Sequence, residues 1–324
     1  MTKVSIIIAT HNRPHLLSRA IGSALSAATE PEIIVVDDAS SGAETISVCH
    51  CFSGIRYVRV DRNQGLGGAR NLGIMASGGD YISFLDDDDI RLPESLDVQI
   101  KALESAPEVG LVYGRALIGD QNVIPTDRSY PDSCPQGDVF WELLEWNFIP
   151  CPTVVFRKSC LYRVGLLDEE IPGVEDWDLW IRIAELYKVA AVEQPVAIWR
   201  QSTPTSGQYT SRAAEMLILC ERLLRRRWFA LPRAASASPD KRRETRRRFL
   251  NHVSDQLMWE TASALKSGHL LRARKSVLAA LRLHPEGAAR RAVRVATLRS
   301  FLTGMLANRK LRKPMHLEQG EVGE

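Results

Sequence analysis

Residues 80–89 read DYISFLDDDD, an apolar run that ends in four consecutive aspartates. The run from Tyr81 to Leu85 has the aromatic and β-branched composition of a buried strand. Adjacent carboxylates repel one another and raise one another's pKa, so a cluster of this kind is usually solvated. An acidic cluster attached directly to a buried strand therefore needs an explanation, and the rest of the sequence offers one.

Three earlier segments also read as buried strands: residues 4–9 (VSIIIA), 32–36 (EIIVV) and 55–60 (IRYVRV). Apolar residues at helical spacing fill residues 14–28, and a second helix is predicted over residues 68–77, just before the acidic strand. Strands that alternate with helices and have continuous apolar runs predict an α/β fold. We expect a Rossmann-like, mostly parallel sheet with helices on both faces.

Polar residues follow three of these strands at the point where each strand ends: Thr10-His11-Asn12, Asp37-Asp38 and Asp86 to Asp89. Because the carboxyl ends of parallel strands meet at one edge of a sheet, where such sheets bind ligands, we expect the three clusters to converge. A carboxylate pair such as Asp86-x-Asp88 can hold a hard divalent cation together with substrate phosphates. The alternative is a solvated acidic turn.

A second acidic segment, GVEDWDLWIR at residues 173–182, places acids beside two tryptophans. Helical spacing directs Trp177 and Trp180 inward and leaves Asp176 in the first turn of the helix, where the helix dipole favours a carboxylate. The functional interpretation is a general base beside an aromatic wall. The alternative is an ordinary acidic helix start.

The charge of the chain is unevenly distributed, although its formal total is only +3. Residues 1–200 carry 17 Lys and Arg against 29 Asp and Glu, a net of −12, and residues 201–324 carry 25 against 10, a net of +15. Helical spacing recurs in residues 246–266, 270–283 and 288–302. We therefore expect one α/β domain over residues 1–205 and a basic α-helical region over residues 206–324.

The six cysteines are scattered, with no second ligand pair at zinc spacing, so we expect reduced thiols in a cytoplasmic protein. The N-terminal residues are too short in their apolar part for a signal peptide. No stretch approaches the length of about 18 uncharged apolar residues that a membrane span requires.

Six segments occur between Val4 and Ser202 in the order VSIIIATHNR, IIVVDDAS, NQGLGGARNLGI, DYISFLDDDD, VGLLDEE and GVEDWDLWIR. Together, their order and spacing resemble glycosyltransferase family 2, the inverting enzymes of GT-A fold that use nucleotide-diphosphate sugars. The resemblance implies a sugar transfer from a nucleotide sugar, with UDP-sugar as the expected donor, to a hydroxyl of a glycan or a lipid-linked acceptor. It also implies Mn²⁺ or Mg²⁺ as cofactor.

The resemblance further implies roles for individual residues. The implied nucleotide-binding residues are Thr10, His11, Arg13, Asp38, Arg70, Asp86 and Asp87. Asp88, together with Asp86, would bind the metal in the manner of a DXD element, and Asp176 would be the catalytic base. The implied acceptor-side residues are Glu175, Trp177 and Asp178.

One position departs from the family pattern. Many relatives carry Arg-x-His after the strand that ends near Trp199, where this chain has Arg200-Gln201-Ser202. A serine cannot supply the charge or the metal-ligand nitrogen of a histidine. Contact with phosphate then falls to Arg200, or the activity is weak.

Two other functions compete with a glycosyltransferase. A sugar-nucleotide nucleotidyltransferase would need a basic glycine-rich loop early in the chain, which residues 9–16 do not supply. A non-catalytic GT-A-like binding module would use the basic tail as a scaffold or to bind nucleic acid, and the arginine runs 225–227 and 246–248 invite this interpretation. No aromatic stacking platform accompanies them, so nucleic acid is not the expected partner. Peripheral association of the basic region with the inner face of a membrane is a further expectation. The alternative is a helical cap on the α/β domain, whose arginines are solvated or paired with the acidic first part of the chain.

Overall fold

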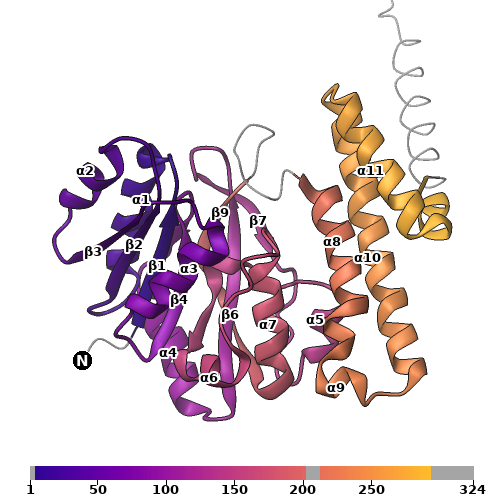
Figure 1. Ribbon diagram of the computed structural model, residues 1–324, viewed down its shortest axis with the longest axis horizontal. Helices are drawn as coiled ribbons and strands as arrows, with labels where there is room; N and C mark the ends of the chain where they lie inside the picture. Colours follow the sequence, from indigo (N-terminus) through magenta and orange to yellow (C-terminus); the bar gives the residue numbers. More distant parts are fainter. Residues whose placement is uncertain (1–3, 202–211, 293–324) are drawn as a thin grey trace, which may run out of the picture. The chain divides into compact units, whose positions relative to one another are not determined.

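The structure is a computed structural model that describes residues 4–201 and 212–292 (Figure 1). The chain divides into two compact units, residues 1–249 and 250–324. The domain boundary predicted at residues 205 and 206 and the departure at Ser202 both lie outside the described residues. Both stay predictions.

Nine strands of the described chain form one sheet in the order β3-β2-β1-β4-β8-β6-β9-β5, with β7 paired to β6. The strands are β1 (Val4–Thr10), β2 (Glu32–Asp38), β3 (Ile55–Val60), β4 (Tyr81–Asp86), β5 (Ile90–Arg91), β6 (Val109–Gly119), β7 (Pro125–Tyr130), β8 (Val155–Arg157) and β9 (Lys188–Arg200). The α/β fold predicted from the sequence is confirmed.

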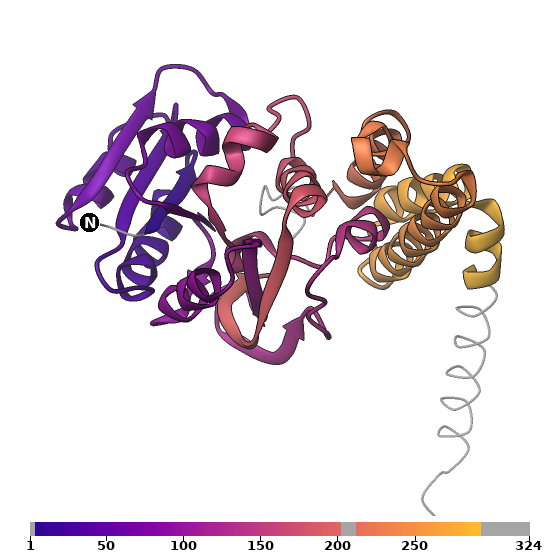
Figure 2. The ribbon, with the colours of Figure 1, turned by 90° about the horizontal axis from the view of Figure 1, so that it is seen from below.

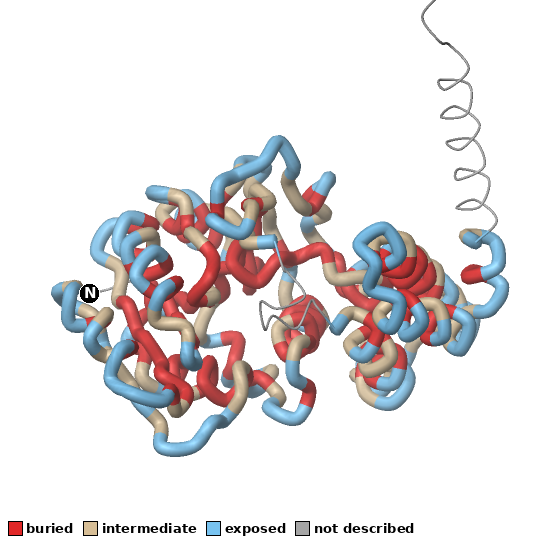
Figure 3. The backbone as a smooth tube through the Cα atoms, turned by 90° about the horizontal axis from the view of Figure 1, so that it is seen from above, coloured by how far each residue is buried: buried red, intermediate tan, exposed pale blue. Residues whose placement is uncertain are grey.

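Strands β3, β2, β1 and β4 form the parallel part of the sheet. In its centre Ile7 lies between Ile34 of β2 and Phe84 of β4, and strand β1 is buried along its whole length (Figure 3). The remaining strands mix directions: β8 runs antiparallel to β4 and β6, whereas β9 runs parallel to β6. The parallel part therefore carries β1, β2 and β4 to the same edge of the sheet, as their end clusters predicted.

Helices cover both faces of this sheet (Figure 2). On one face α1 (Pro14–Ser26) and α4 (Ser95–Ser105) share a core with alternate residues of β1, such as Ile6 and Ile8. On the other face lie α3 (Gly65–Ala76), against β1 and β2, and α7 (Glu175–Leu186), whose Trp180 ring lies 6.2 Å from that of Phe84. A Cβ at Gly73 would lie 2.3 Å from Ile7 Cγ2, so the missing side chain lets α3 approach the sheet closely.

Short elements complete this part of the chain. They are α2 (Glu44–His50), α5 (Phe140–Glu145), η1 (Cys151–Thr153), η2 (Lys158–Cys160) and α6 (Leu161–Val164). Helices α8 (Ala213–Arg226), η4 (Trp228–Ala230) and α9 (Pro232–Ala235) follow residue 211, and α10 (Pro239–Lys266) then begins.

In this helical region, Arg227, Arg233 and Arg248 form ion pairs with acids of the α/β part of the same unit. Arg227 pairs with Asp168 and Asp178, and Arg233 pairs with Asp138. These pairs neutralise part of the basic excess of the C-terminal third, as a helical cap would.

The second unit contains the end of α10, α11 (Leu270–Leu283) and a helical segment at residues 285–292. The predicted helix over residues 270–283 is confirmed with the same bounds, whereas the predicted helix over residues 288–302 extends beyond the described residues. Within the described chain, no helix combines the length and the apolar character needed to cross a bilayer.

Candidate active site

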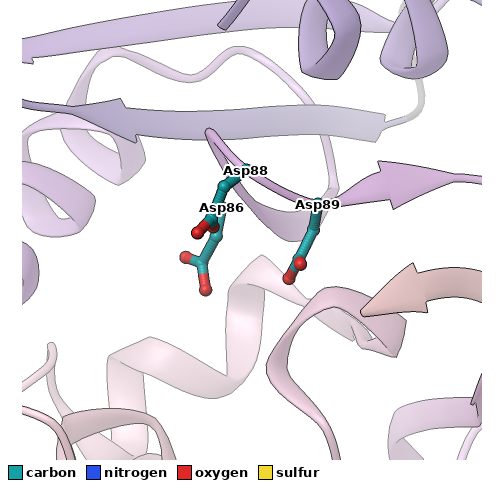
Figure 4. Close-up of side chains that lie close together, drawn as sticks. All are labelled: Asp86, Asp88 and Asp89. Carbon is teal, nitrogen blue, oxygen red and sulfur yellow. The ribbon is translucent and has the colours of Figure 1, made fainter. Parts of the chain in front are cut away.

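The acidic cluster forms a tight turn at the end of β4. The backbone N–H of Asp89 donates to the carbonyl of Asp86 at 3.1 Å, and the carboxylates of Asp86, Asp88 and Asp89 project to the same side (Figure 4). One oxygen from each of these three carboxylates lies within 4.8 Å of the others. The cluster is mostly buried and is not a solvated turn, since Asp87, Asp88 and Asp89 are all buried.

Arginines from two distant segments compensate this charge. Asp87 accepts a hydrogen bond from Thr10 Oγ1 at 2.7 Å and pairs with Arg13 Nη2 at 2.7 Å. Asp88 Oδ2 lies 3.2 Å from Nη1 of Arg13 and 3.2 Å from Nη1 of Arg200. Two of the predicted nucleotide-side residues, Thr10 and Arg13, are therefore brought directly onto the acidic turn.

The compensation is incomplete, as the pKa values of these carboxyls indicate. Burial, opposed by Arg13, raises the pKa of Asp87 to about 7. Burial and the neighbouring charge of Asp86 raise the pKa of Asp88, and burial followed by Asp88 raises that of Asp89 further. A carboxyl with a raised pKa is one whose ionised form lacks sufficient counter-charge.

A divalent cation fits this deficit. Three carboxylates present the hard oxygen ligands that Mg²⁺ and Mn²⁺ prefer. Within the described chain, Asp89 Oδ2 is buried and has no hydrogen-bond partner, while its Oδ1 accepts from the backbone N–H of Arg200 at 2.8 Å. The residues that would hold the metal are Asp86, Asp88 and Asp89, the first two of which were predicted from the sequence.

Arg70 connects the acidic turn to the start of α7. Its Nη2 lies 2.7 Å from Asp86 Oδ1, and its Nη1 lies 3.0 Å from Glu175 Oε1. Its guanidinium also lies over the ring of Phe84, 5.1 Å from the centroid. Because Arg70 is almost completely buried, it fixes the first turn of α7 against the end of β4.

Asp176 lies in that first turn and stays partly exposed, whereas the side chains on either side of it are buried. Its Oδ1 accepts from the backbone N–H of Trp177 at 2.6 Å. Burial and the adjacent charge of Glu175 raise the pKa of Asp176 to about 7, against the opposing effect of Arg70. A carboxyl with a pKa near neutrality is suited to accept and release a proton.

The three residues expected on the acceptor side have buried side chains. Glu175 accepts from the backbone N–H of Gly173 at 2.6 Å in addition to its pair with Arg70, and Trp177 donates from Nε1 to the carbonyl of Leu143 at 2.8 Å. In this geometry the side chains of Glu175 and Trp177 make structural contacts within the protein.

Asp178 departs further from that expectation. It is fully buried and binds Arg182 Nε at 2.8 Å, Arg227 Nε at 3.1 Å and Trp228 Nε1 at 2.9 Å. With both oxygens engaged, Asp178 anchors α7 to α8 and η4. Its expected place beside an acceptor stays a prediction.

His11 and Asp38, which were predicted to bind the nucleotide, lie at the ends of β1 and β2. His11 is exposed, and its Nδ1 lies 2.7 Å from the carbonyl of Asp38, which assigns the proton to Nδ1. Asp38 accepts from the backbone N–H groups of Gln64 at 2.6 Å and Gly65 at 3.0 Å, so it caps the N-terminus of α3. Ala39 has a positive φ of 61°, a strained conformation that often occurs at functional sites.

The structure adds residues to the site that the sequence did not single out. Asp89 completes the carboxylate group, and its signal was its place in the run of four aspartates. Cys151, in η1, lies near Arg70. Burial raises the pKa of the Cys151 thiol, and the positive charge of Arg70 opposes this rise. No sequence motif marks Cys151, because only the pairing of distant segments brings η1 to the end of β4.

Solved structures share this fold. The crystal structure of S. aureus TarS residues 1–349 superposes with a TM-score of 0.50 at 15% identity, covering 88% of this chain and 92% of that one. A TarS structure solved in complex with UDP-GlcNAc superposes with a TM-score of 0.51 at 15% identity, covering 85% of this chain and 90% of that one. The sheet and the helices therefore define a GT-A type α/β fold.

Sequence comparison gives the family. The family model described as glycosyl transferase family 2 matches residues 5–164, and this part of the chain belongs to that family. A protein of Rickettsia felis named an uncharacterized glycosyltransferase is 32% identical over 212 residues, 63% of this chain and 34% of that protein. One of Haemophilus influenzae with the same name is 26% identical over 183 residues, 56% of this chain and 62% of that protein. The chain thus spans about a third of the length of the first relative.

Proposed function

We propose that the protein is an inverting glycosyltransferase that moves a sugar from a nucleotide-diphosphate sugar to an acceptor hydroxyl. The observation that carries the proposal is the link through Arg70, which pairs with both Asp86 and Glu175. This link joins a group of potential metal ligands to the helix turn that contains Asp176. A family 2 domain with this arrangement has the parts needed for sugar transfer.

In the proposed reaction Asp176 accepts the proton of the acceptor hydroxyl while the oxygen of that hydroxyl attacks the anomeric carbon. A single displacement from the opposite face inverts the configuration at that carbon. Bound Mn²⁺ or Mg²⁺ would stabilise the negative charge of the departing diphosphate. Arg13 and Arg200, already beside Asp88, are positioned to bind the same diphosphate.

UDP-sugar is the proposed donor. Two TarS structures of similar fold were solved in complex with UDP and with UDP-GlcNAc. In this chain Thr10, His11 and Asp38 would border the base, with the exposed ring of His11 available for stacking. Each carboxylate oxygen of Asp38 has two lone pairs, and the cap of α3 uses one lone pair on each oxygen. Asp38 can therefore still accept a further hydrogen bond.

The acceptor is proposed to be a glycan or a lipid-linked sugar at the inner face of a membrane. This choice rests on the basic C-terminal region and not on a described acceptor subsite. Peripheral membrane association is part of the same proposal.

A non-catalytic binding module with a nucleic-acid-binding or scaffolding tail remains the second candidate. The internal ion pairs of Arg227 and Arg233 count against it, because they consume charge that a nucleic acid would need.

One assay tests the proposal. Purified protein is incubated with a panel of nucleotide sugars, with Mn²⁺, Mg²⁺ or EDTA, and the released nucleoside diphosphate is measured. The Asp176→Asn variant is the matched control. Metal-dependent release that this variant loses supports a transferase. Nucleotide-sugar binding with no release under any condition supports the binding module.

A further inference from the structure

Helix α11 exposes large apolar side chains, which is unusual for a helix of a globular unit. The exposed fractions are 78% for Leu271, 53% for Leu278 and 47% for Leu281. Its buried face consists mainly of small residues: Ala273, Ser276, Ala279 and Ala280. The leucines therefore do not contribute to the core of the unit, and another environment must account for them.

Basic residues share the exposed face with these leucines. At 3.6 residues per turn, Arg274, Lys275 and Arg282 fall within the same arc of the helix as Leu271 and Leu278. No Asp or Glu occurs between Thr261 and Pro285, so the face has no acidic residue of its own segment. Arg272 lies outside this arc and pairs with Glu260 of α10 at 2.6 Å.

The turn that joins α10 to α11 also exposes apolar side chains. Leu265 is 51% exposed and Leu270 is 68% exposed, and the four residues between them are exposed as well. One of these four is Lys266. We call the surface formed by Leu265, Lys266, Leu270, Leu271, Arg274, Lys275, Leu278, Leu281 and Arg282 the leucine-arginine face.

We infer that the leucine-arginine face binds the surface of an anionic lipid bilayer. Leucines that insert at the boundary of headgroups and acyl chains, flanked by Lys and Arg that contact lipid phosphates, are the features of an interfacial amphipathic helix. Long basic side chains can extend to the headgroups while their stems stay on apolar surface.

A second copy of the chain fits this face less well. Two copies related by a two-fold axis would gather Arg274, Lys275 and Arg282 of both copies in one interface. Such like-charge contacts oppose association, whereas an anionic bilayer accommodates the leucines and the basic residues together.

The inference rests on the peripheral membrane association in the proposed function, and it specifies the surface that binds the membrane. Its test measures binding and not sugar transfer. The transferase proposal can therefore stand if the lipid proposal fails.

The test is co-sedimentation of the full chain with large vesicles, made either of phosphatidylcholine alone or of phosphatidylcholine with phosphatidylserine. We expect binding only to the anionic vesicles, weakening as salt is raised. Arg274→Ser with Arg282→Ser should lower the partition coefficient roughly 30-fold, at about fivefold for each basic residue. Leu271→Ser with Leu278→Ser should lower it at least about tenfold. All four side chains lie within α11 and are exposed, so the circular dichroism spectrum of these variants should be unchanged.

Matched controls come from the first unit. Ile124→Ser removes an exposed apolar side chain, and Lys101→Ser with Arg128→Ser removes two exposed charges. These variants should bind the vesicles like the unmodified chain. Equal binding to neutral and anionic vesicles, or unchanged binding by the α11 variants, overturns the proposal. Light scattering separates the alternative: a dimer that only the leucine variant dissociates, together with no vesicle binding, assigns the face to a second copy.

Discussion

Arg70 of α3 and Asp86 at the end of β4 form an ion pair of 2.7 Å, and the arginine in this pair is nearly inaccessible to solvent. The second arm of the same guanidinium binds Glu175, which is also buried. Removing a partner from a buried ion pair leaves an uncompensated charge, which costs far more than losing an exposed pair.

Arg70→Met should therefore lower the free energy of unfolding by about 3–5 kcal/mol, as measured by urea denaturation. The double variant Arg70→Met with Glu175→Gln should recover part of this loss, because the unpaired negative charge of Glu175 is also removed. Arg115→Met is the matched control, since Arg115 pairs with the exposed Glu193, and its effect should be small. Equal effects of Arg70→Met and Arg115→Met would contradict a structural role for Arg70.

Asp176→Asn should lower kcat by about 10²–10⁴-fold, the range typical for loss of a general base. The KM for the donor should change little, because the proposed role of Asp176 concerns the acceptor. Steady-state kinetics with a nucleotide sugar measure both constants. Asp132→Asn, a change at an exposed acid, serves as control. If the Asp176→Asn variant keeps a kcat close to that of the unmodified chain, Asp176 is not the general base.

The raised pKa of Asp176 gives a stability prediction with a definite sign. The folded pKa is about 7 and the ordinary value is 3.8, so the folded state holds this proton more tightly than the unfolded state. Asp176 should therefore cost stability increasingly as the pH rises from about 4 to about 7. Asp176→Asn lacks this cost, so its Tm should exceed that of the unmodified chain at pH 8 and should approach it at pH 4. Thermal unfolding at the two pH values tests this prediction. A Tm difference that is the same at both pH values would refute the coupling between the protonation of Asp176 and stability.

Asp88→Ala should abolish metal-dependent binding of the nucleotide sugar, and EDTA should have the same effect on the unmodified chain. The physical reason is the loss of one of the three carboxylates that lie within reach of a single cation. Asp80→Ala, at the other end of β4, is the matched control and should bind as before. Calorimetry with and without Mn²⁺ measures the effect. Intact binding and turnover in EDTA would exclude a metal role for the acidic turn.

Asp38→Ala should have two separate effects. Loss of the cap of α3 should lower the free energy of unfolding by about 1 kcal/mol. If Asp38 also contacts the base, binding of UDP alone should weaken even without metal. Asp38→Asn keeps a capping acceptor and should retain most of the stability. Unchanged UDP affinity in both variants would confine Asp38 to its capping role.

The parallel part of the fold was predictable because its signals are local. Continuous apolar runs marked β1, β2, β3 and β4, and the position of polar residues after each strand indicated their common edge. The mixed part was not predictable in the same way, because β6, β8 and β9 are joined by pairings between residues far apart in the chain. Periodicity within a segment carries no information about such partners.

The candidate site shows the same division. Asp86, Asp88 and Asp176 could be identified from their positions in short motifs. The roles of their neighbours could not, because burial decides them: Asp178 reads like Asp176 in the sequence but is turned toward Arg182 and Arg227. The helical start of α3 also came three residues earlier than predicted, since the Asp38 cap acts from a distant strand.

The acidic turn already holds its own counter-ions, Arg13, Arg70 and Arg200, before any ligand arrives. In the proposed function, a divalent cation and a nucleotide-diphosphate sugar, whose charges are opposite and about equal, would enter as a nearly neutral pair. Donor binding at this turn would then exchange ion-pair partners among charges of both signs and would hardly change the net charge of the site. Its equilibrium constant should consequently depend only weakly on ionic strength, in contrast to a site that attracts a diphosphate with unpaired basic residues.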